Sequence, residues 1–223
     1  MPERYQWQSA LATLGIEARA LGSAGRTGVE LSERQAGTQL AIRGNALDAD
    51  FSATVAKILG MELPVTPKTA QREGGNALLW LGPDEWLAVT AEHDDTLGPR
   101  LAEALDDVHH AIVDVGHSRT VIGLEGPNSR DVLMKGTNID LHPRHFAPGN
   151  CIQAHLGRCH MLLHQIDDGP GYDIYIHRSF AVYAWNWLCD AAREYGLAVR
   201  GTGTRKRGRI SNPSPPVSAK LRQ

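Results

Sequence analysis

The sequence contains few of the features that build disulfide-stabilised or membrane-spanning proteins. Its 223 residues include only three cysteines, Cys151, Cys159 and Cys189. An odd number this widely spaced does not suit a disulfide framework. No apolar run approaches the roughly 20 residues needed to cross a bilayer, and the N-terminus lacks the basic start and apolar stretch of a signal peptide. We therefore expect a cytoplasmic protein with no membrane partner.

Acidic residues are missing from the end of the chain. From Arg200 onward there are seven basic residues and no acidic one, whereas the rest of the chain carries 16 basic and 25 acidic residues. The stretch 201–223 has almost no large apolar residues, so it cannot bury enough surface to offset its ordering entropy. We expect a disordered, basic, Pro-rich tail on an acidic body. No aromatic residues alternate with its charges, so nucleic acid is not the expected partner, although salt-dependent phosphate contact remains an alternative.

The sequence also lacks the motifs of nucleotide-binding proteins and hydrolases. The glycine-rich stretch 22–28 has no Gly-Lys-Ser/Thr and no strand directly before it, and a dinucleotide fingerprint is absent. Asp114, His117 and Ser118 are residue types of a hydrolase triad, but triad members normally meet through the fold. No nucleophile elbow surrounds Ser118. A turn between two strands is the simpler interpretation.

Histidines and cysteines of the second half do not match a known zinc motif. The candidates are His142, His145, Cys151, Cys159, His160 and His164. Zinc favours such side chains, but the sequence has no C-x-x-C pair and no H-E-x-x-H helix. On a strand at 161–166, Cys159 would point away from the face that His160 and His164 share. We expect no catalytic, cofactor-binding or metal-binding residue on this chain.

A tryptophan-bearing hairpin is the most distinctive feature that is present. In ALLWLGPDEWLAVT (77–90), two apolar runs flank Gly82-Pro83-Asp84-Glu85, which predicts strand, turn and strand. Trp80 and Trp86 lie beside the turn. Because tryptophan is enriched at interfaces, contact with a partner and simple core filling are both open interpretations.

Apolar periodicity predicts an alternation of strands and helices over the rest of the chain. Strands are expected at 38–43, 120–124, 152–156, 161–166, 172–176 and 197–200. Helices are expected over roughly 49–59, around 97–105, from Pro127 to near Gly136, and after Arg178. For the first of these, Asp48 or Asp50 is the expected cap and Gly60 the expected end.

The two halves of this pattern follow the same order. In LAIRGNALDADFSATVAKILG and in VIGLEGPNSRDVLMKG a strand ends at glycine and a helix follows, and a hairpin and another helix come after each. We interpret this as an internal duplication. The predicted fold is α+β, with duplicated strand-helix-strand-strand-helix units and helices packed on mainly antiparallel sheets. The expected divisions are 1–36 as an extension packed on the core, 37–110 and 111–200 as the halves, and 201–223 as the tail.

Four segments resemble the gamma-subunit family of heterotetrameric sarcosine oxidase. Its most specific motifs here are LGPDEWL and the D-L-H-P-R-x-F-x-P-G loop (Asp140–Gly149). The four segments are QLAIRGNALDADFSATVAKILGMELPVTP (39–67), ALLWLGPDEWLAVT (77–90), VDVGHSRTVIGLEGPNSRDVLMKGTNIDLHPRHFAPGNCIQ (113–153) and YDIYIHRSFAVYAWNWLCDAA (172–192).

The resemblance implies a fold like the folate-binding domain of aminomethyltransferases. It also implies an accessory, non-catalytic role in a complex that oxidatively demethylates sarcosine to glycine, with the one-carbon unit passed to tetrahydrofolate or released as formaldehyde. The implied partners are alpha, beta and delta subunits, and the implied cofactors of the holoenzyme are FAD, FMN, NAD and tetrahydrofolate, none bound by this chain alone. The carboxylate of a folate pocket has no identifiable equivalent here. The basic tail departs from the family core.

Subunit contacts are expected at two exposed turns. The residues expected to contact a partner subunit are Asp84, Glu85, Trp86, Arg144, His145 and Phe146. One alternative is a stand-alone, folate-binding protein of the aminomethyltransferase type, which would need a pocket with a buried carboxylate. Another is the equivalent subunit of a related N-methyl amino acid dehydrogenase.

Overall fold

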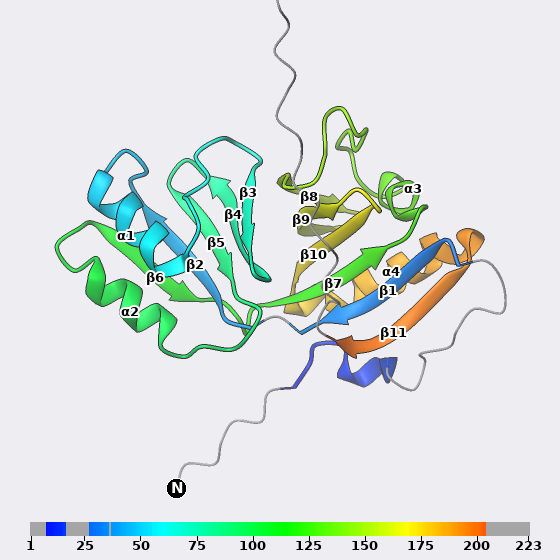
Figure 1. Ribbon diagram of the computed structural model, residues 1–223. Helices are drawn as coiled ribbons and strands as arrows, with labels where there is room; N and C mark the ends of the chain where they lie inside the picture. Colours follow the sequence, from blue (N-terminus) through cyan, green and yellow to red (C-terminus); the bar gives the residue numbers. More distant parts are fainter. Residues whose placement is uncertain (1–7, 17–26, 36, 204–223) are drawn as a thin grey trace, which may run out of the picture.

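Two antiparallel-rich sheets pack face to face, and helices cover their outer sides (Figure 1). The structure is a computed structural model and describes residues 8–16, 27–35 and 37–203. No helix in these ranges is long and apolar enough to span a bilayer.

The first sheet has the strand order β3-β4-β5-β2-β6. Its half of the chain runs through β2 (Gln39–Gly44), α1 (Ala49–Leu59), β3 (Ala70–Glu73), β4 (Asn76–Gly82), β5 (Glu85–Val89), α2 (Leu97–Ala104) and β6 (His110–Asp114).

The second sheet has the order β8-β9-β10-β7-β1-β11. Its half runs through β7 (Arg119–Glu125), α3 (Ser129–Met134), β8 (Cys151–Leu156), β9 (Cys159–Asp167), β10 (Gly171–His177), α4 (Ala181–Ala192) and β11 (Leu197–Gly203), and it takes in β1 (Val29–Arg34) from the start of the chain. Short 3₁₀ turns lie at Ala12–Leu14, Arg178–Phe180 and Arg193–Tyr195.

The α+β fold and the repeated order are confirmed. The strands of the second half were all predicted, whereas β3 and β6 of the first half were not, so each repeat has two more strands than the predicted strand-helix-strand-strand-helix unit. Each half runs strand, helix, three strands, helix, strand. The sheet orders also match, except that β1 is inserted between β7 and β11. In the first half β6 pairs antiparallel with β2; in the second, β1 takes that place beside β7 and β11 pairs parallel with β1.

Several details differ from the sequence prediction. Residues 29–34, expected in an N-terminal extension, form an interior strand of the second sheet, and residues 111–114 continue the sheet of the first half. Residues 201–203, expected to begin the tail, complete β11. The remainder of the tail, 204–223, and Trp7 lie outside the described residues.

Helix α1 shows how the sequence sets the element bounds. The Asp48 carboxylate accepts hydrogen bonds from the backbone N–H groups of Asp50 and Phe51, so it caps the helix. The helix ends at Gly60, whose φ of 68° is the left-handed conformation that glycine adopts without strain. Phe51 and Val55 point into the core, as the predicted apolar face requires.

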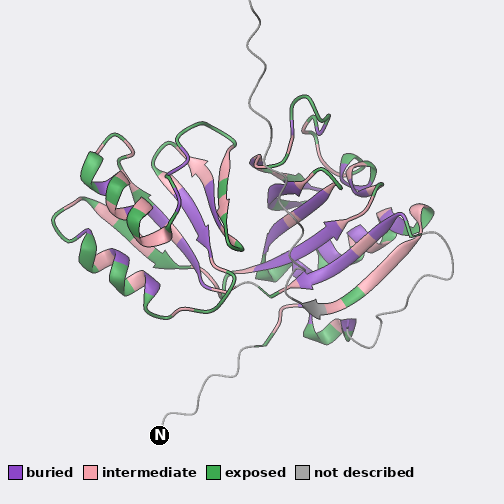
Figure 2. Ribbon diagram, viewed as in Figure 1, coloured by how far each residue is buried: buried purple, intermediate pink, exposed green. Residues whose placement is uncertain are grey.

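Three apolar clusters fill the spaces between the four layers (Figure 2). One lies between α1, α2 and the first sheet, and another between α3, α4 and the second sheet. The third, which we call the inter-sheet core, joins the two sheets directly. Its buried members are Ala77, Leu79, Leu87 and Val89 from β4 and β5, and Val121, Cys151, Leu162 and Tyr175 from the second sheet.

Trp86 belongs to the core under α1 and is not a surface residue. Its side chain is fully buried, its ring centroid lies 5.9 Å from that of Phe51, and its indole N–H donates to the Pro64 carbonyl at 2.8 Å. Its partner across the hairpin, Trp80, is only partly buried. Trp86 therefore fixes both the hairpin and the loop that holds Pro64.

Replacing Trp86 with phenylalanine should lower the free energy of unfolding by about 1–3 kcal/mol, because the Pro64 carbonyl would stay buried without its donor. Urea unfolding followed by circular dichroism measures the change. Trp80→Phe, at the opposed position of the same hairpin, is the matched control and should cost less than half as much. Equal losses for the two variants would contradict the role given to the indole hydrogen bond.

Cys151 should resist thiol reagents until the protein unfolds. Burial in the inter-sheet core raises the pKa of its thiol from 9.0 to about 12, and its Sγ donates to the Thr69 carbonyl at 3.2 Å. At pH 8 almost no thiolate is present, so iodoacetamide should modify the half-buried Cys189 first, as read by peptide mass spectrometry. Labelling of Cys151 as fast as Cys189 would show that the sheets separate readily.

The Cys151 thiol also makes stability depend on pH. Because its pKa is higher in the folded state than in the unfolded chain, its contribution to the free energy of unfolding should be lost as pH rises from 9 towards 12.

Candidate functional site

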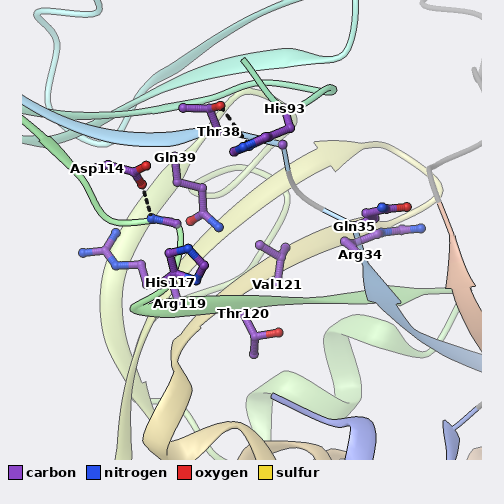
Figure 3. A pocket seen from close by; sticks show the side chains of 12 residues that line it. Arg34, Gln35, Thr38, Gln39, His93, Asp114, His117, Arg119, Thr120 and Val121 are labelled. Atoms are coloured by element: carbon purple, nitrogen blue, oxygen red, sulfur yellow. Dashed lines mark hydrogen bonds between the residues drawn. The ribbon is translucent and has the colours of Figure 1, made fainter. Parts of the chain in front are cut away.

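A pocket of about 350 Å³ lies where the chain crosses from one sheet to the other (Figure 3). Two crossovers border it. Gln35, Gly37 and Thr38 belong to the one that leads from β1 to β2, and residues 115–118 form the one that joins β6 to β7. The lining residues are Arg34, Gln35, Gly37, Thr38, Gln39, His93, Asp114, Gly116, His117, Arg119, Thr120 and Val121.

Backbone and side-chain hydrogen bonds hold the two crossovers in place. Thr38 donates from its hydroxyl to the Asp94 carbonyl at 3.0 Å and from its N–H to the Thr90 hydroxyl at 2.8 Å. The Val115 N–H donates to the Gln39 carbonyl at 2.8 Å, which ties the second crossover to the first. At Gly37 a Cβ would lie 2.2 Å from the Glu92 carbonyl oxygen, so only glycine fits.

Two polar groups of the lining are buried without a hydrogen-bond partner in the described part of the chain. Gln39 is 2% exposed, its amide points into the pocket, and its Oε1 accepts nothing (Figure 3). Nη1 of Arg119 is likewise buried and donates to nothing. Burial lowers the pKa of the Arg119 guanidinium, although Glu85 and the Tyr175 hydroxyl oppose the shift. An arginine remains charged even so, and an unsatisfied buried donor costs free energy.

Arg34, the other arginine of the pocket, has its charge engaged elsewhere. It forms ion pairs with Glu125 and with Asp173, the latter at 3.3 Å. Burial lowers the pKa of Arg34, but the two carboxylates outweigh this and the net shift is upward. The cation available to a molecule in the pocket is therefore that of Arg119.

The residues of the hypothetical hydrolase triad take part in the turn itself. The Asp114 carboxylate accepts the Gly116 N–H at 2.8 Å, and the Ser118 hydroxyl donates to the Val115 carbonyl at 2.8 Å. His117 is exposed on the pocket lining. Asp114 and Ser118 thus shape the second crossover.

The candidate metal ligands do not converge. Within the described residues, no three histidine, cysteine or acidic side chains are placed to hold a metal ion. The rings of His142 and His145 lie 6.4 Å apart in an exposed loop, whereas Cys151 and Cys159 are buried in different apolar clusters.

The expected subunit contacts divide into exposed and buried side chains. Asp84 lies at the exposed tip of the β4–β5 turn beside the half-buried Glu85, and the Arg43 guanidinium lies 3.8 Å and 3.7 Å from their carboxylates. Trp86 is buried directly below this turn.

The loop before β8 repeats this arrangement. Arg144 and His145 are exposed at its tip, while Phe146 is 3% exposed and packs in the core of the second half. The N–H groups of His145 and Phe146 both donate to the His142 carbonyl, which closes the loop into a tight turn. Trp86 and Phe146 therefore act as internal supports of the two turns.

Sequence reasoning missed the pocket because no motif marks it. Gln39 lies in the predicted strand 38–43, and Arg119 directly precedes the predicted strand 120–124; neither is singled out there as a site residue. A polar residue at the first position of an otherwise apolar strand was the available signal, since such a side chain, when buried, needs a partner.

A chain of heterotetrameric sarcosine oxidase from Corynebacterium sp. U-96, solved in complex with pyrrole 2-carboxylate, superposes with a TM-score of 0.76 at 32% identity, over 85% of this chain and 96% of that one. Aminomethyltransferase T of the glycine cleavage system from Bartonella henselae gives a TM-score of 0.56 at 12% identity, over 85% of this chain and 51% of that one. The second likeness concerns the fold alone and agrees with the predicted folate-binding-domain fold.

Sequence comparison points the same way. Sarcosine oxidase subunit gamma from Corynebacterium sp. (strain P-1) is 36% identical over 80% of this chain and 87% of its own length. The corresponding subunit from an Arthrobacter species is 34% identical over the same shares. The model of the sarcosine oxidase, gamma subunit family matches residues 43–194. The chain belongs to the sarcosine oxidase gamma subunit family.

Proposed function

We propose that this chain is the accessory gamma subunit of a heterotetrameric sarcosine oxidase. The observation that carries the proposal is the likeness to a chain of such an assembly over 96% of that chain's length. The complex would oxidatively demethylate sarcosine to glycine and pass the one-carbon unit to tetrahydrofolate or release it as formaldehyde. The partners would be the alpha, beta and delta subunits.

The side chains of this subunit support an accessory role in the reaction. The Ser118 hydroxyl is engaged in a turn, and burial raises the pKa of both the Cys151 and the Cys159 thiols, so these groups are poor nucleophiles. FAD, FMN and NAD would be held by the larger subunits. This chain would contribute shape and contact surface.

The pocket does not fit the folate requirement stated from the sequence. A folate site of the aminomethyltransferase type was expected to need a buried carboxylate. The one carboxylate in the pocket lining, that of Asp114, is exposed and binds a backbone N–H of its own turn. This favours the subunit function over a stand-alone, folate-binding protein.

Charged residues of the two turns are the proposed contact points. They are the exposed Asp84 and the half-buried Glu85 on one turn, and the exposed Arg144 and His145 on the other. The buried Trp86 and Phe146 lie beneath them. Charges at the edge of an interface mainly set partner choice and association rate. Both turns offer such charges on rigid supports.

Purification of the tagged chain from its native cells tests the assembly. The eluate should contain larger subunits, show a flavin absorption spectrum and consume oxygen when sarcosine is added. A colourless chain that elutes alone and binds tetrahydrofolate would refute the proposal. A flavin complex that reduces an artificial acceptor, but not oxygen, would instead identify the related dehydrogenase.

Charge reversal at Arg144 should weaken retention of the partner subunits by about tenfold, because the loop tip would present the wrong charge to its partner. The Arg144→Glu chain is co-expressed with the other subunits, and the amount retained is compared at low and high salt. Arg158→Glu, which reverses an exposed arginine in the β8–β9 turn, is the matched control and should leave retention unchanged. Equal retention by both variants would remove this loop from the interface.

A further inference from the structure

We propose that the pocket between the crossovers binds a small α-amino acid. The carboxylate of the ligand would bind Arg119, and its ammonium group would donate to Gln39 and Asp114. This site is separate from the assembly role proposed above, because the residues that form it all belong to this chain.

Arg119 supplies the group that selects an anion. Arg119 lines the pocket, and its buried Nη1 lacks a hydrogen-bond partner among the described residues. Burial lowers the pKa of the Arg119 guanidinium, and the carboxylate of Glu85 opposes this shift through an electrostatic interaction. A buried guanidinium donor of this kind gains most from a carboxylate, whose two oxygens match the guanidinium fork. The other pocket arginine, Arg34, already binds two carboxylates and offers no comparable vacancy.

Gln39 supplies an acceptor that a donor group of the ligand would satisfy. Its Oε1 is buried in a side chain that is 2% exposed, and it accepts no hydrogen bond within the described part of the chain. Asp114 also lines the pocket, so a second acceptor is available there. An ammonium group donates up to three hydrogen bonds and satisfies both acceptors.

The size of the pocket agrees with this ligand class. A volume of about 350 Å³ is at the lower end of the range for small-molecule sites. It holds a free amino acid with some water, and it excludes a dinucleotide. A ligand there would touch residues from both crossovers and so bridge the two halves of the chain.

Isothermal titration calorimetry on the full-length chain, purified without its partners, tests the proposal with five probes. Glycine and N-methylglycine carry a carboxylate and N–H donors and should bind. Trimethylglycine keeps the charges but has no N–H donor, acetate lacks the ammonium group, and methylamine lacks the carboxylate. Each of these three should bind at least tenfold more weakly. Equal binding of all five, or binding of none, would overturn the proposal.

Two substitutions assign the contacts. Arg119→Met should weaken glycine binding at least tenfold, with Arg158→Met as the matched control. Gln39→Leu should weaken binding and also raise the melting temperature, because it removes a buried acceptor that has no donor. Gln71→Leu, on the exposed face of β3, is its control. A purely structural role for Gln39 predicts lower stability instead.

These outcomes are independent of the assembly. A chain that joins a flavin-containing complex but binds no amino acid would refute this inference alone. A chain that binds glycine but elutes without partners would refute only the accessory-subunit function. If Arg119→Met fails to fold, Gln39→Leu and the comparison of glycine with trimethylglycine still decide.

Discussion

The contact between the two sheets is the constraint on which the rest of the structure depends. Each sheet must bury both faces, one under helices and one against the other sheet, so its central strands cannot alternate between apolar and polar residues. In β4, Leu78 packs toward the helices, while Ala77 and Leu79 pack toward the second sheet. Burial on both faces explains why the run at 77–81 is apolar throughout. Cys151 fits in the inter-sheet core for a related reason, because burial raises the pKa of its thiol and keeps it neutral.

The same constraint produces the pocket. A chain that builds two facing sheets has to pass between them, and between the described strands it does so from β1 to β2 and from β6 to β7. The crossovers are turns with backbone polar groups, which apolar packing cannot satisfy. Polar side chains such as those of Thr90 and Asp114 accept hydrogen bonds from the backbone N–H groups of Thr38 and Gly116 in these turns. The space beside them is consequently lined by polar residues, and Gln39 and Arg119 are left with unmet hydrogen bonds there.

How much the sequence predicts depends on how local the controlling interaction is. The bounds of helix α1 were predicted to within a residue because local residues set them: Asp48 caps its first turn, and Gly60 directly follows its last. The repeated order was visible because each half uses the same local succession. Strand β1 was missed because four of the six residues in VELSER are polar. It becomes a strand only by pairing with β7 and with β11, and β11 is more than 160 residues away in the sequence. The burial of Trp86 depends equally on a distant carbonyl, that of Pro64, and the pocket depends on two crossovers meeting.

The burial of Trp86 and Phe146 changes how this subunit would hold its partners. An interface built on tryptophan anchors requires those side chains to be desolvated by the partner, but here the chain's own core has already desolvated both. Their contribution would be to support the two turns from below, so that Asp84, Glu85, Arg144 and His145 would meet a partner in fixed positions. A rigid, charged turn loses little conformational entropy on binding. Recognition through such turns would then depend on charge and shape at the turn tips and would be more sensitive to salt than an aromatic interface, because exposed charges are screened over about 10 Å at 0.1 M ionic strength.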